Sequence, residues 1–480
     1  MLKRFTLFDT IYSKKGSGKM SIIASYIVPH PPLILPEIGR GEERQIQKTV
    51  DAYDKIAREI SDIKPDTIII TTPHSIMYSD YLHISPGKRA KGDFGDFGYR
   101  NVSIETEYDE DMAIKISKEA ESQGIPAGSL GERNKKLDHG FMIPLYFVNK
   151  YYKDYKTVRI SISGLSFLQH YEFGKSIAKV AEKSNKKIVF IASGDLSHML
   201  KDAGPYGYRE EGPIFDREVT EAMKSGDFIK FLQFDEEFCE KAAECGLRSF
   251  VIMTGALDGK GLDSDLLSYE GPFGVGYAVA SFKVLGDDEN RHLDKIFLDK
   301  ELQRIESLKK EEDEYVRLAR QTLENYVINH KLIKRPDNLS KEMLENKAGV
   351  FVSLKLDGSL RGCIGTIFPI TESIADEIIR NAISAGLEDP RFPPVTEEEL
   401  PRLIYSVDVL GQAEEISSID QLDPKEYGVI VSKGHRRGLL LPNLDGVDTA
   451  EEQISIALRK AGIKPNENYK LERFQVVRHE

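Results

Sequence analysis

The residue types best suited to chemistry in this chain are five side chains that occur in order before residue 250. Four are imidazoles and one is a carboxylate: His30, His74, His139, His198 and Glu244. Two histidines and one carboxylate, with coordination positions left open, form the ligand set of mononuclear non-haem Fe(II) oxygenases. Further imidazoles beside such a centre can exchange protons, because imidazole titrates near neutral pH. The pattern predicts a metal site with its own acid/base groups.

Three of these histidines follow segments that look like buried strands. His30 follows SIIASYIVP, His74 follows TIIITTP, and His198 follows KIVFIAS through a short turn. Ligands of open α/β sheets bind outside the carboxyl ends of the strands, so the three imidazoles are expected to meet at one edge of one sheet. Each histidine alone is typical of a hydrogen-bonded residue at a strand end. The ordered set favours a shared site.

The carboxylate Glu244 lies in the segment AAECG, where its neighbours are small or apolar. Burying an unpaired carboxylate is costly unless a cation compensates its charge. A metal ion held with the histidines would supply that cation. Acidic residues also stand close to His139 in LDHG and to His198 in GDLSH, but their spacing does not show whether either carboxylate orients its ring.

The elements that must position these residues alternate short apolar runs with amphipathic stretches. Strand-like runs cover residues 21–28, 67–72, 158–163 and 187–193, and helical patterns cover residues 42–63 and 173–181. This alternation predicts an α/β layered domain with a mostly parallel or mixed central sheet over residues 20–285. Residues 1–19 are interpreted as a flexible extension, and Met20 as an alternative start.

A dense run of charge over residues 286–313 predicts a charged linker that runs into a solvated helix. Beyond it, residues 314–480 again mix helical and strand patterns, so a smaller α+β domain is expected. The whole chain has 480 residues, a formal net charge of −12 and three cysteines. These features disfavour nucleic acid as a partner and a disulfide framework. No apolar run is long enough to span a membrane, so a cytoplasmic protein is expected.

The ordered set VPHPP, TTPH, LDHG, SGDLSH and AECG resembles the catalytic B subunit of class III extradiol ring-cleavage dioxygenases. The resemblance implies that His30, His74 and Glu244 hold Fe(II), that His198 is the catalytic acid/base, and that His139 donates a hydrogen bond to bound oxygen. It further implies a catechol-like or aminophenol-like aromatic substrate and O2. In the related Memo family a cysteine takes the place of the carboxylate, and Cys245 stands next to Glu244.

The second domain resembles the AMMECR domain of the AmmeMemoRadiSam system protein A family. The motifs that carry this resemblance are LRGCIGT, DPRFPP and GLLLP. It implies partners of the Memo type and of the radical S-adenosylmethionine type. Cys363, close to Arg361, is either a reactive thiol beside a cation or a small buried residue in a tight turn. The second interpretation is favoured, and no catalysis is assigned to this domain.

The leading hypothesis is therefore an Fe(II)-dependent extradiol-type dioxygenase domain fused to an AMMECR domain. One alternative is a metal-binding module of a modification system that performs no ring cleavage. Another is a zinc hydrolase that uses the same ligands. His139 and His198 favour an oxygen-handling enzyme, because a simple metal binder needs no acid/base pair.

Overall fold

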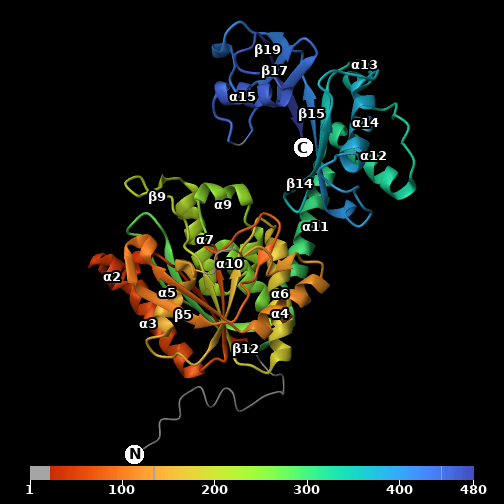
Figure 1. Cartoon of the computed structure of the whole chain (residues 1–480). Coiled ribbons are helices and arrows are strands. Elements are labelled where there is room, and N and C mark those ends of the chain that lie inside the picture. The colour runs from red at the N-terminus through yellow and green to blue at the C-terminus, as the bar shows by residue number, and fades with distance from the viewer. Residues whose placement is uncertain (1–21, 133–135, 445) are drawn as a thin grey trace, which may run out of the picture. The chain divides into compact units, whose positions relative to one another are not determined.

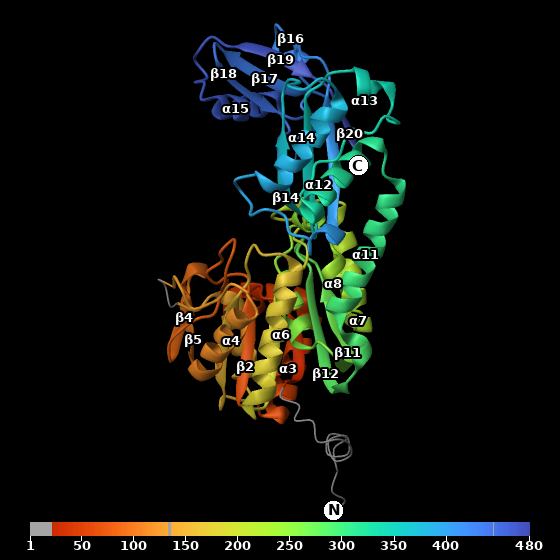
Figure 2. The same ribbon diagram turned by 90° about the vertical axis from the view of Figure 1, so that its right-hand side faces the viewer.

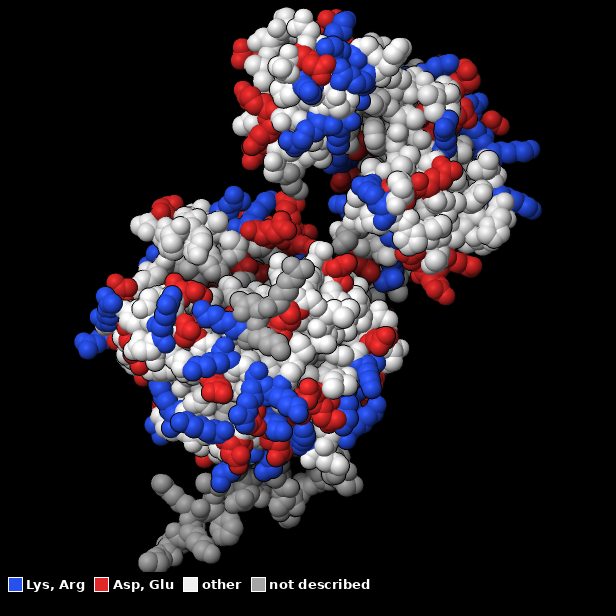
Figure 3. Space-filling view, in the orientation of Figure 1, with Lys and Arg blue, Asp and Glu red and all other residues white. Residues whose placement is uncertain are grey.

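The structure is a computed structural model that describes residues 22–132, 136–444 and 446–480 (Figure 1). The chain divides into two compact units, one ending at Leu298 and the other beginning at Asp299. The extension expected over residues 1–19 lies outside the described residues. Among the described helices, none is both long and apolar enough to cross a membrane. On the face shown in Figure 3, acidic and basic side chains are interspersed over both units.

The described part of the first unit is built around a six-stranded sheet in the order β11-β12-β1-β8-β2-β7. Neighbouring strands from β1 to β7 are parallel, whereas β12 pairs antiparallel with both β1 and β11. The strands are β1 (Ile22–Val28), β2 (Thr67–Thr72), β7 (Lys156–Ser161), β8 (Ile188–Ser193), β11 (Lys260–Glu270) and β12 (Tyr277–Asp287). The predicted α/β domain with a mixed central sheet is confirmed.

Helices cover both faces of this sheet, which is why its central strands are apolar throughout. Every residue of β2 and of β8 is buried. On one face the core includes side chains of α3 (Gln47–Ile63) and α5 (His139–Val148). On the other face it includes side chains of α4 (Glu110–Ser122), α6 (Phe167–Ser184) and α10 (Leu247–Ala256); Figure 2 shows α4 and α6 on their side of the sheet.

The predicted segments agree in type with the observed elements, and their bounds differ in three places. The segment 42–63 divides into a 3-10 helix and α3, the strand predicted over 158–163 is observed two residues earlier at both ends, and the helix predicted over 173–181 extends over the whole of α6. The other elements of the first unit are η1 (Pro32–Ile34), α2 (Pro36–Gly39), η2 (Glu42–Ile46), β3 (Leu82–His83), β4 (Arg89–Phe94), η3 (Gly95–Phe97), β5 (Tyr99–Glu107), β6 (Ala127–Gly128), β9 (Leu200–Lys201), β10 (Gly207–Tyr208), α7 (Glu211–Ser225), α8 (Ile229–Gln233), α9 (Glu236–Ala242) and η4 (Glu289–Arg291).

The charged segment 286–313 contains the end of β12, η4 and, over most of its length, helix α11 (Leu293–Glu311). The division between the two units falls within this helix. The described part of the second unit holds two antiparallel sheets with the orders β14-β13-β15-β20 and β16-β19-β17-β18, so the predicted α+β class is confirmed. Helix α14 packs on the first sheet and α15 on the second.

The elements of the second unit are α12 (Glu314–Asn329), α13 (Lys341–Glu345), β13 (Val350–Leu356), β14 (Ser359–Gly365), α14 (Ile374–Leu387), η5 (Leu400–Arg402), β15 (Leu403–Leu410), β16 (Glu414–Glu415), η6 (Ile419–Gln421), β17 (Gly428–Lys433), β18 (Arg436–Leu440), α15 (Ala450–Ala461), β19 (Lys470–Phe474) and β20 (Val476–His479).

Candidate metal centre

The four predicted histidines meet at the carboxyl edge of the parallel strands. His30 follows β1, His74 follows β2, His198 follows β8, and His139 is the first residue of α5. The ring centroids of His30 and His74 are 4.7 Å apart, and those of His74 and His139 are 4.2 Å apart. All four side chains line one cavity. The structure therefore brings together every imidazole of the predicted set.

The orientation of the His30 ring is set by Ser193, the last residue of β8. The Ser193 hydroxyl donates to the carbonyl oxygen of Gly140 over 2.6 Å, and its oxygen lies 2.9 Å from His30 Nδ1. Because the hydroxyl proton is already used, Ser193 accepts a hydrogen bond from Nδ1–H. This leaves His30 Nε2 without a proton, so it accepts a hydrogen bond from His74 Nε2 over 2.9 Å.

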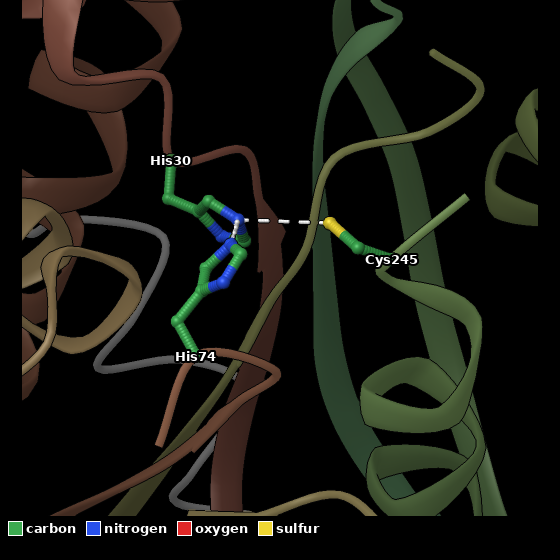
Figure 4. A group of neighbouring side chains, drawn as sticks. All are labelled: His30, His74 and Cys245. Carbon is green, nitrogen blue, oxygen red and sulfur yellow. Dashed lines mark hydrogen bonds between the residues drawn. The ribbon is translucent and has the colours of Figure 1, made fainter. Parts of the chain in front are cut away.

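The third potential ligand beside these two nitrogens is Cys245 (Figure 4). One ligand atom each from His30, His74 and Cys245 lie within 4.8 Å of one another, and Cys245 Sγ is 3.6 Å from His30 Nε2. The thiol also accepts the backbone N–H of Asp195 at 3.3 Å. Burial, and then the charges of Asp195 and Glu244, raise the pKa of the Cys245 thiol. A cation at this position would oppose that shift.

Glu244 does not join the histidines. Its carboxylate oxygen Oε2 accepts the backbone N–H of Leu247, the first residue of α10, over 2.6 Å. That N–H has no partner within the helix, so the carboxylate satisfies it. Burial raises the pKa of Glu244, and its backbone hydrogen bonds oppose this. The ligand set that the structure assembles therefore contains Cys245 in the position expected for Glu244.

A residue in the left-handed conformation separates the two candidate ligands, Glu244 and Cys245, from the preceding helix. Ala243 ends α9 with φ of 50°. Its carbonyl oxygen accepts a hydrogen bond from His198 Nδ1 over 2.5 Å. Because a carbonyl only accepts, Nδ1 carries the proton and Nε2 is the basic nitrogen of His198. The segment that presents Cys245 thus also fixes the tautomer of His198.

The imidazoles are held neutral by their surroundings. Burial, followed by the charges of other histidines, lowers the pKa of His30 well below its usual value, and burial also lowers the pKa of His74 and His198. The pKa of His139 falls to about 4, again mainly through burial. Neutral imidazole is the form that binds metal ions. Near neutral pH the rings are therefore ready to act as ligands or bases without losing a proton first.

The cavity beside this group has a volume of about 780 Å³, and its walls combine aromatic rings with prolines and a few charged side chains. Besides the four histidines, its lining includes Phe97, Asp195, Lys201, Tyr206, Phe273 and Tyr277. The Tyr206 ring stands edge-on to His198 with centroids 5.1 Å apart. Burial raises the pKa of Asp195 to about 7. A cavity of this size with a few converging polar groups suits a small organic ligand.

The second unit holds no comparable group among the residues that the structure describes. Arg361 forms an ion pair with Glu399, with Nε and Oε1 2.7 Å apart. Cys363 donates its backbone N–H to Asp389 over 2.9 Å, and its sulfur accepts the Ser353 hydroxyl at 3.2 Å. These contacts fix the backbone of β14. Cys363 is half-buried and lies within this strand, not in a turn, and both interpretations of its thiol stay predictions.

Sequence reasoning missed the contributions of Ser193 and Cys245 to this centre. Ser193 carries a signal, because it ends a strand at the same sheet edge as the histidines. Cys245 carries a weaker one, because only its position beside Glu244 brings it to attention.

The fold and the site define an α/β protein with a histidine-rich centre at the strand ends. Residues 24–280 match the family described as the catalytic LigB subunit of aromatic ring-opening dioxygenase, and residues 316–479 match the AMMECR1 family. The chain belongs to the LigB family through its first unit and carries an AMMECR1 domain in its second.

Several proteins are similar to this chain. Protein CA_C1420 of Clostridium acetobutylicum is 46% identical over 473 residues, covering 96% of this chain and 99% of that protein. A Thermotoga maritima protein is 49% identical over 170 residues, which cover 35% of this chain and 98% of that protein. A crystal structure of a Pyrococcus horikoshii protein shows 34% identity over 34% of this chain and 88% of its own, with a TM-score of 0.32.

Proposed function

We propose that the first unit is a metal-dependent enzyme in which His30, His74 and Cys245 hold one metal ion. In this proposal His198 exchanges protons with a small aromatic ligand in the adjoining cavity. One observation carries it: two imidazole nitrogens and a thiol sulfur lie within 4.8 Å of one another. Those atoms stand at the carboxyl edge of the sheet, where α/β proteins bind their ligands.

The ligand types indicate which metal fits. A 2-His-1-carboxylate iron centre needs a carboxylate in the third position, and Glu244 is engaged with the start of α10 instead. The residues present do not fit that iron centre. A thiolate with two imidazoles suits zinc or another soft or borderline ion. When bound, such an ion would supply Lewis acidity toward a ligand hydroxyl or a water molecule.

The side chains of the cavity account for the remaining steps. His198 keeps its basic Nε2 because Nδ1–H is held by the Ala243 carbonyl, so it can accept a proton from a ligand hydroxyl. Phe97 and Tyr206 line the cavity with ring faces and edges, which suits an aromatic ligand. The rings of His139 and Phe97 have centroids 5.2 Å apart, and the ring N–H of His139 can donate a hydrogen bond to a ligand in the cavity.

A second candidate is oxygen-dependent ring opening of a catechol-like or aminophenol-like substrate. The LigB family match and the presence of both His139 and His198 in the cavity support it. It requires Fe(II) and a different arrangement around Glu244. The Memo-type and radical S-adenosylmethionine partners implied by the AMMECR resemblance are a proposal for the second unit.

The test is metal analysis of anaerobically purified protein, with an O2-uptake screen over catechols and aminophenols. The expected result is one zinc per chain in the wild type and in Glu244→Gln, and loss of zinc in Cys245→Ala. Glu244→Gln is the matched control, because the amide oxygen still accepts the Leu247 N–H. Metal loss in Glu244→Gln with retention in Cys245→Ala would overturn the assignment. Stoichiometric iron with O2 uptake would favour the second candidate.

A further inference from the structure

Asp138 is linked by hydrogen bonds to the segments that carry two of the four histidines, His74 and His139. It is the N-cap of α5, and its Oδ1 accepts the Phe141 backbone N–H over 3.0 Å. The same oxygen accepts the hydroxyl of Thr72, the last residue of β2, over 2.6 Å. The Thr72 oxygen in turn accepts the backbone N–H of His74 at 3.3 Å.

The hydrogen bonds in this chain are all donated in the same direction, from His74 to Thr72 and from Thr72 to Asp138. The Thr72 hydroxyl spends its proton on Asp138, so its oxygen is free to accept from His74 N–H. The loop that carries His74 is thereby tied to the helix start that carries His139. The two rings stack with an interplanar angle of 28°. A change at Asp138 would release both rings at once.

The first turn of α5 also touches His30. A Cβ atom at Gly140 would stand 2.6 Å from Thr72 Oγ1 and 3.4 Å from His30 Nδ1, so only glycine allows this approach. The Gly140 carbonyl accepts the Ser193 hydroxyl that orients His30. One helix turn thus supports three of the four imidazoles.

The charge of Asp138 lies beside the same rings, because Asp138 directly precedes His139 in the chain and is linked through Thr72 to the loop that carries His74. The Asp138 side chain is only 10% exposed, and its other carboxylate oxygen lies 3.9 Å from Nη1 of the buried Arg159. A carboxylate so largely withdrawn from water and this close to imidazole ligands favours a cation between them.

We propose that Asp138 is a positioning residue for the metal centre: through Thr72 it holds the His74 loop against the start of α5, and its negative charge supports the bound cation. This inference rests on the proposed function. Residues behind metal ligands typically change metal affinity by about 10- to 100-fold when they are replaced. The two contributions, hydrogen bond and charge, can be separated by substitution.

The chain offers a matched control at the opposite end of the same strand. Thr67, the first residue of β2, donates its hydroxyl to Asp109 over 2.6 Å. Asp109 is the buried N-cap of α4, and it pairs with Lys186 at 2.6 Å. The same threonine–aspartate–helix arrangement therefore occurs once beside the metal centre and once at the far end of β2.

The experiment measures zinc affinity of the full-length protein by competition with a chromophoric chelator. Thr72→Val breaks the hydrogen bonds and keeps the charge, whereas Asp138→Asn keeps an acceptor oxygen and removes the charge. Each is expected to weaken zinc binding by about 10-fold, and Thr72→Ser, which restores the hydroxyl, is expected to recover wild-type affinity. The cobalt-substituted Thr72→Val protein should show a shifted absorption spectrum, because a ligand loop has moved.

The controls Thr67→Val and Asp109→Asn should lower the thermal unfolding temperature but leave zinc affinity within about 2-fold of wild type, since no ligand is attached to them. Equal losses of affinity in Thr72→Val and Thr67→Val would overturn the inference, because a general loss of stability would then suffice. Unchanged affinity in both Thr72→Val and Asp138→Asn, with wild-type zinc binding intact, would overturn this inference alone. Absence of zinc binding by the wild type would overturn the proposed function as well.

Discussion

Two half-buried cysteines, one in each unit, stand in opposite surroundings. Cys245 faces the ring nitrogen of His30, with His74 close behind. Cys363 has its backbone N–H held by Asp389 and its carbonyl held by Arg391, and its sulfur meets only a serine hydroxyl among its hydrogen-bond partners in the described part of the chain. Both cysteines stand directly beside a glycine in the sequence, so local sequence does not separate them.

The difference lies in the chemistry of the neighbours. Neutral imidazoles offer lone pairs, and a cation shared with the thiolate satisfies all of them together. A carboxylate and a guanidinium already neutralise each other, and Arg391 lowers the pKa of Asp389 by donating hydrogen bonds to it. The charged neighbours of Cys363 thus neutralise each other, whereas Cys245 stands with two neutral imidazoles, the groups for which we propose a shared metal ion.

Replacing Cys245 is the most direct test of the proposed difference between the two cysteines. Cys245→Ala is expected to weaken zinc binding by more than about 100-fold, because losing a ligand exceeds the effect of losing residues behind it. Chelator competition measures the change. Cys363→Ser serves as the control and should bind zinc as the wild type does. Equal zinc affinity in Cys245→Ala and the wild type would remove the distinction between the two thiols.

The pH dependence of metal binding sharpens the comparison. The pKa of the Cys245 thiol is raised by burial and by Asp195, so the thiol is protonated near neutral pH and must lose its proton to bind zinc. The pKa values of His30 and His74 are lowered, so both rings are already neutral near neutral pH and release no proton when zinc binds. Zinc affinity should rise about tenfold per pH unit between about pH 6 and pH 8. A flat profile would show that no thiol is deprotonated.

Replacing Glu244 has a smaller expected effect, and on stability rather than on metal. Glu244→Ala leaves the Leu247 N–H without its acceptor, which should destabilise the start of α10 by about 1 kcal/mol. Hydrogen exchange at the Leu247 amide measures this local opening. Glu244→Gln should restore most of the protection. Faster exchange in both variants would mean that the charge, and not the acceptor, stabilises the helix start.

The smallest effect is expected at Cys363. Cys363→Ser keeps a small side chain beside the Ser353 hydroxyl, and the backbone contacts to Asp389 and Arg391 persist. The second unit should lose less than about 1 kcal/mol of stability, as for a conservative change away from a site. Thermal unfolding of the full chain followed by a probe in this unit tests it. A larger loss would assign the sulfur itself a structural role.

Much of the fold could be predicted because its central strands are buried on both faces. Strands β1, β2 and β8 follow continuous β-branched runs, and the helices on either side leave no other place for such runs. The predicted strands do not include the hairpin of β11 and β12. β11 is only partly buried along most of its length, so its apolar signal is weak, whereas β12 is buried over its first six residues and carries a signal that the prediction did not use.

Three of the four histidines could be predicted for the same reason, since parallel strands present the residues beyond their carboxyl ends at one sheet edge; His139 begins a helix instead. The third ligand could not be settled in this way. Glu244 and Cys245 are adjacent, and which of them faces the histidines depends on the left-handed turn at Ala243 and on the demand of α10 for an acceptor. Neither is visible in residue types or spacing.

The turn at Ala243 has a consequence for the choice of metal ligand. The sequence sets a hard oxygen donor and a soft sulfur donor on consecutive residues after this turn, and Cys245 is the one that stands beside His30 and His74. We infer that a substitution at residue 243, outside every proposed ligand, would change which donor faces the histidines and with it the metal ion that the centre prefers.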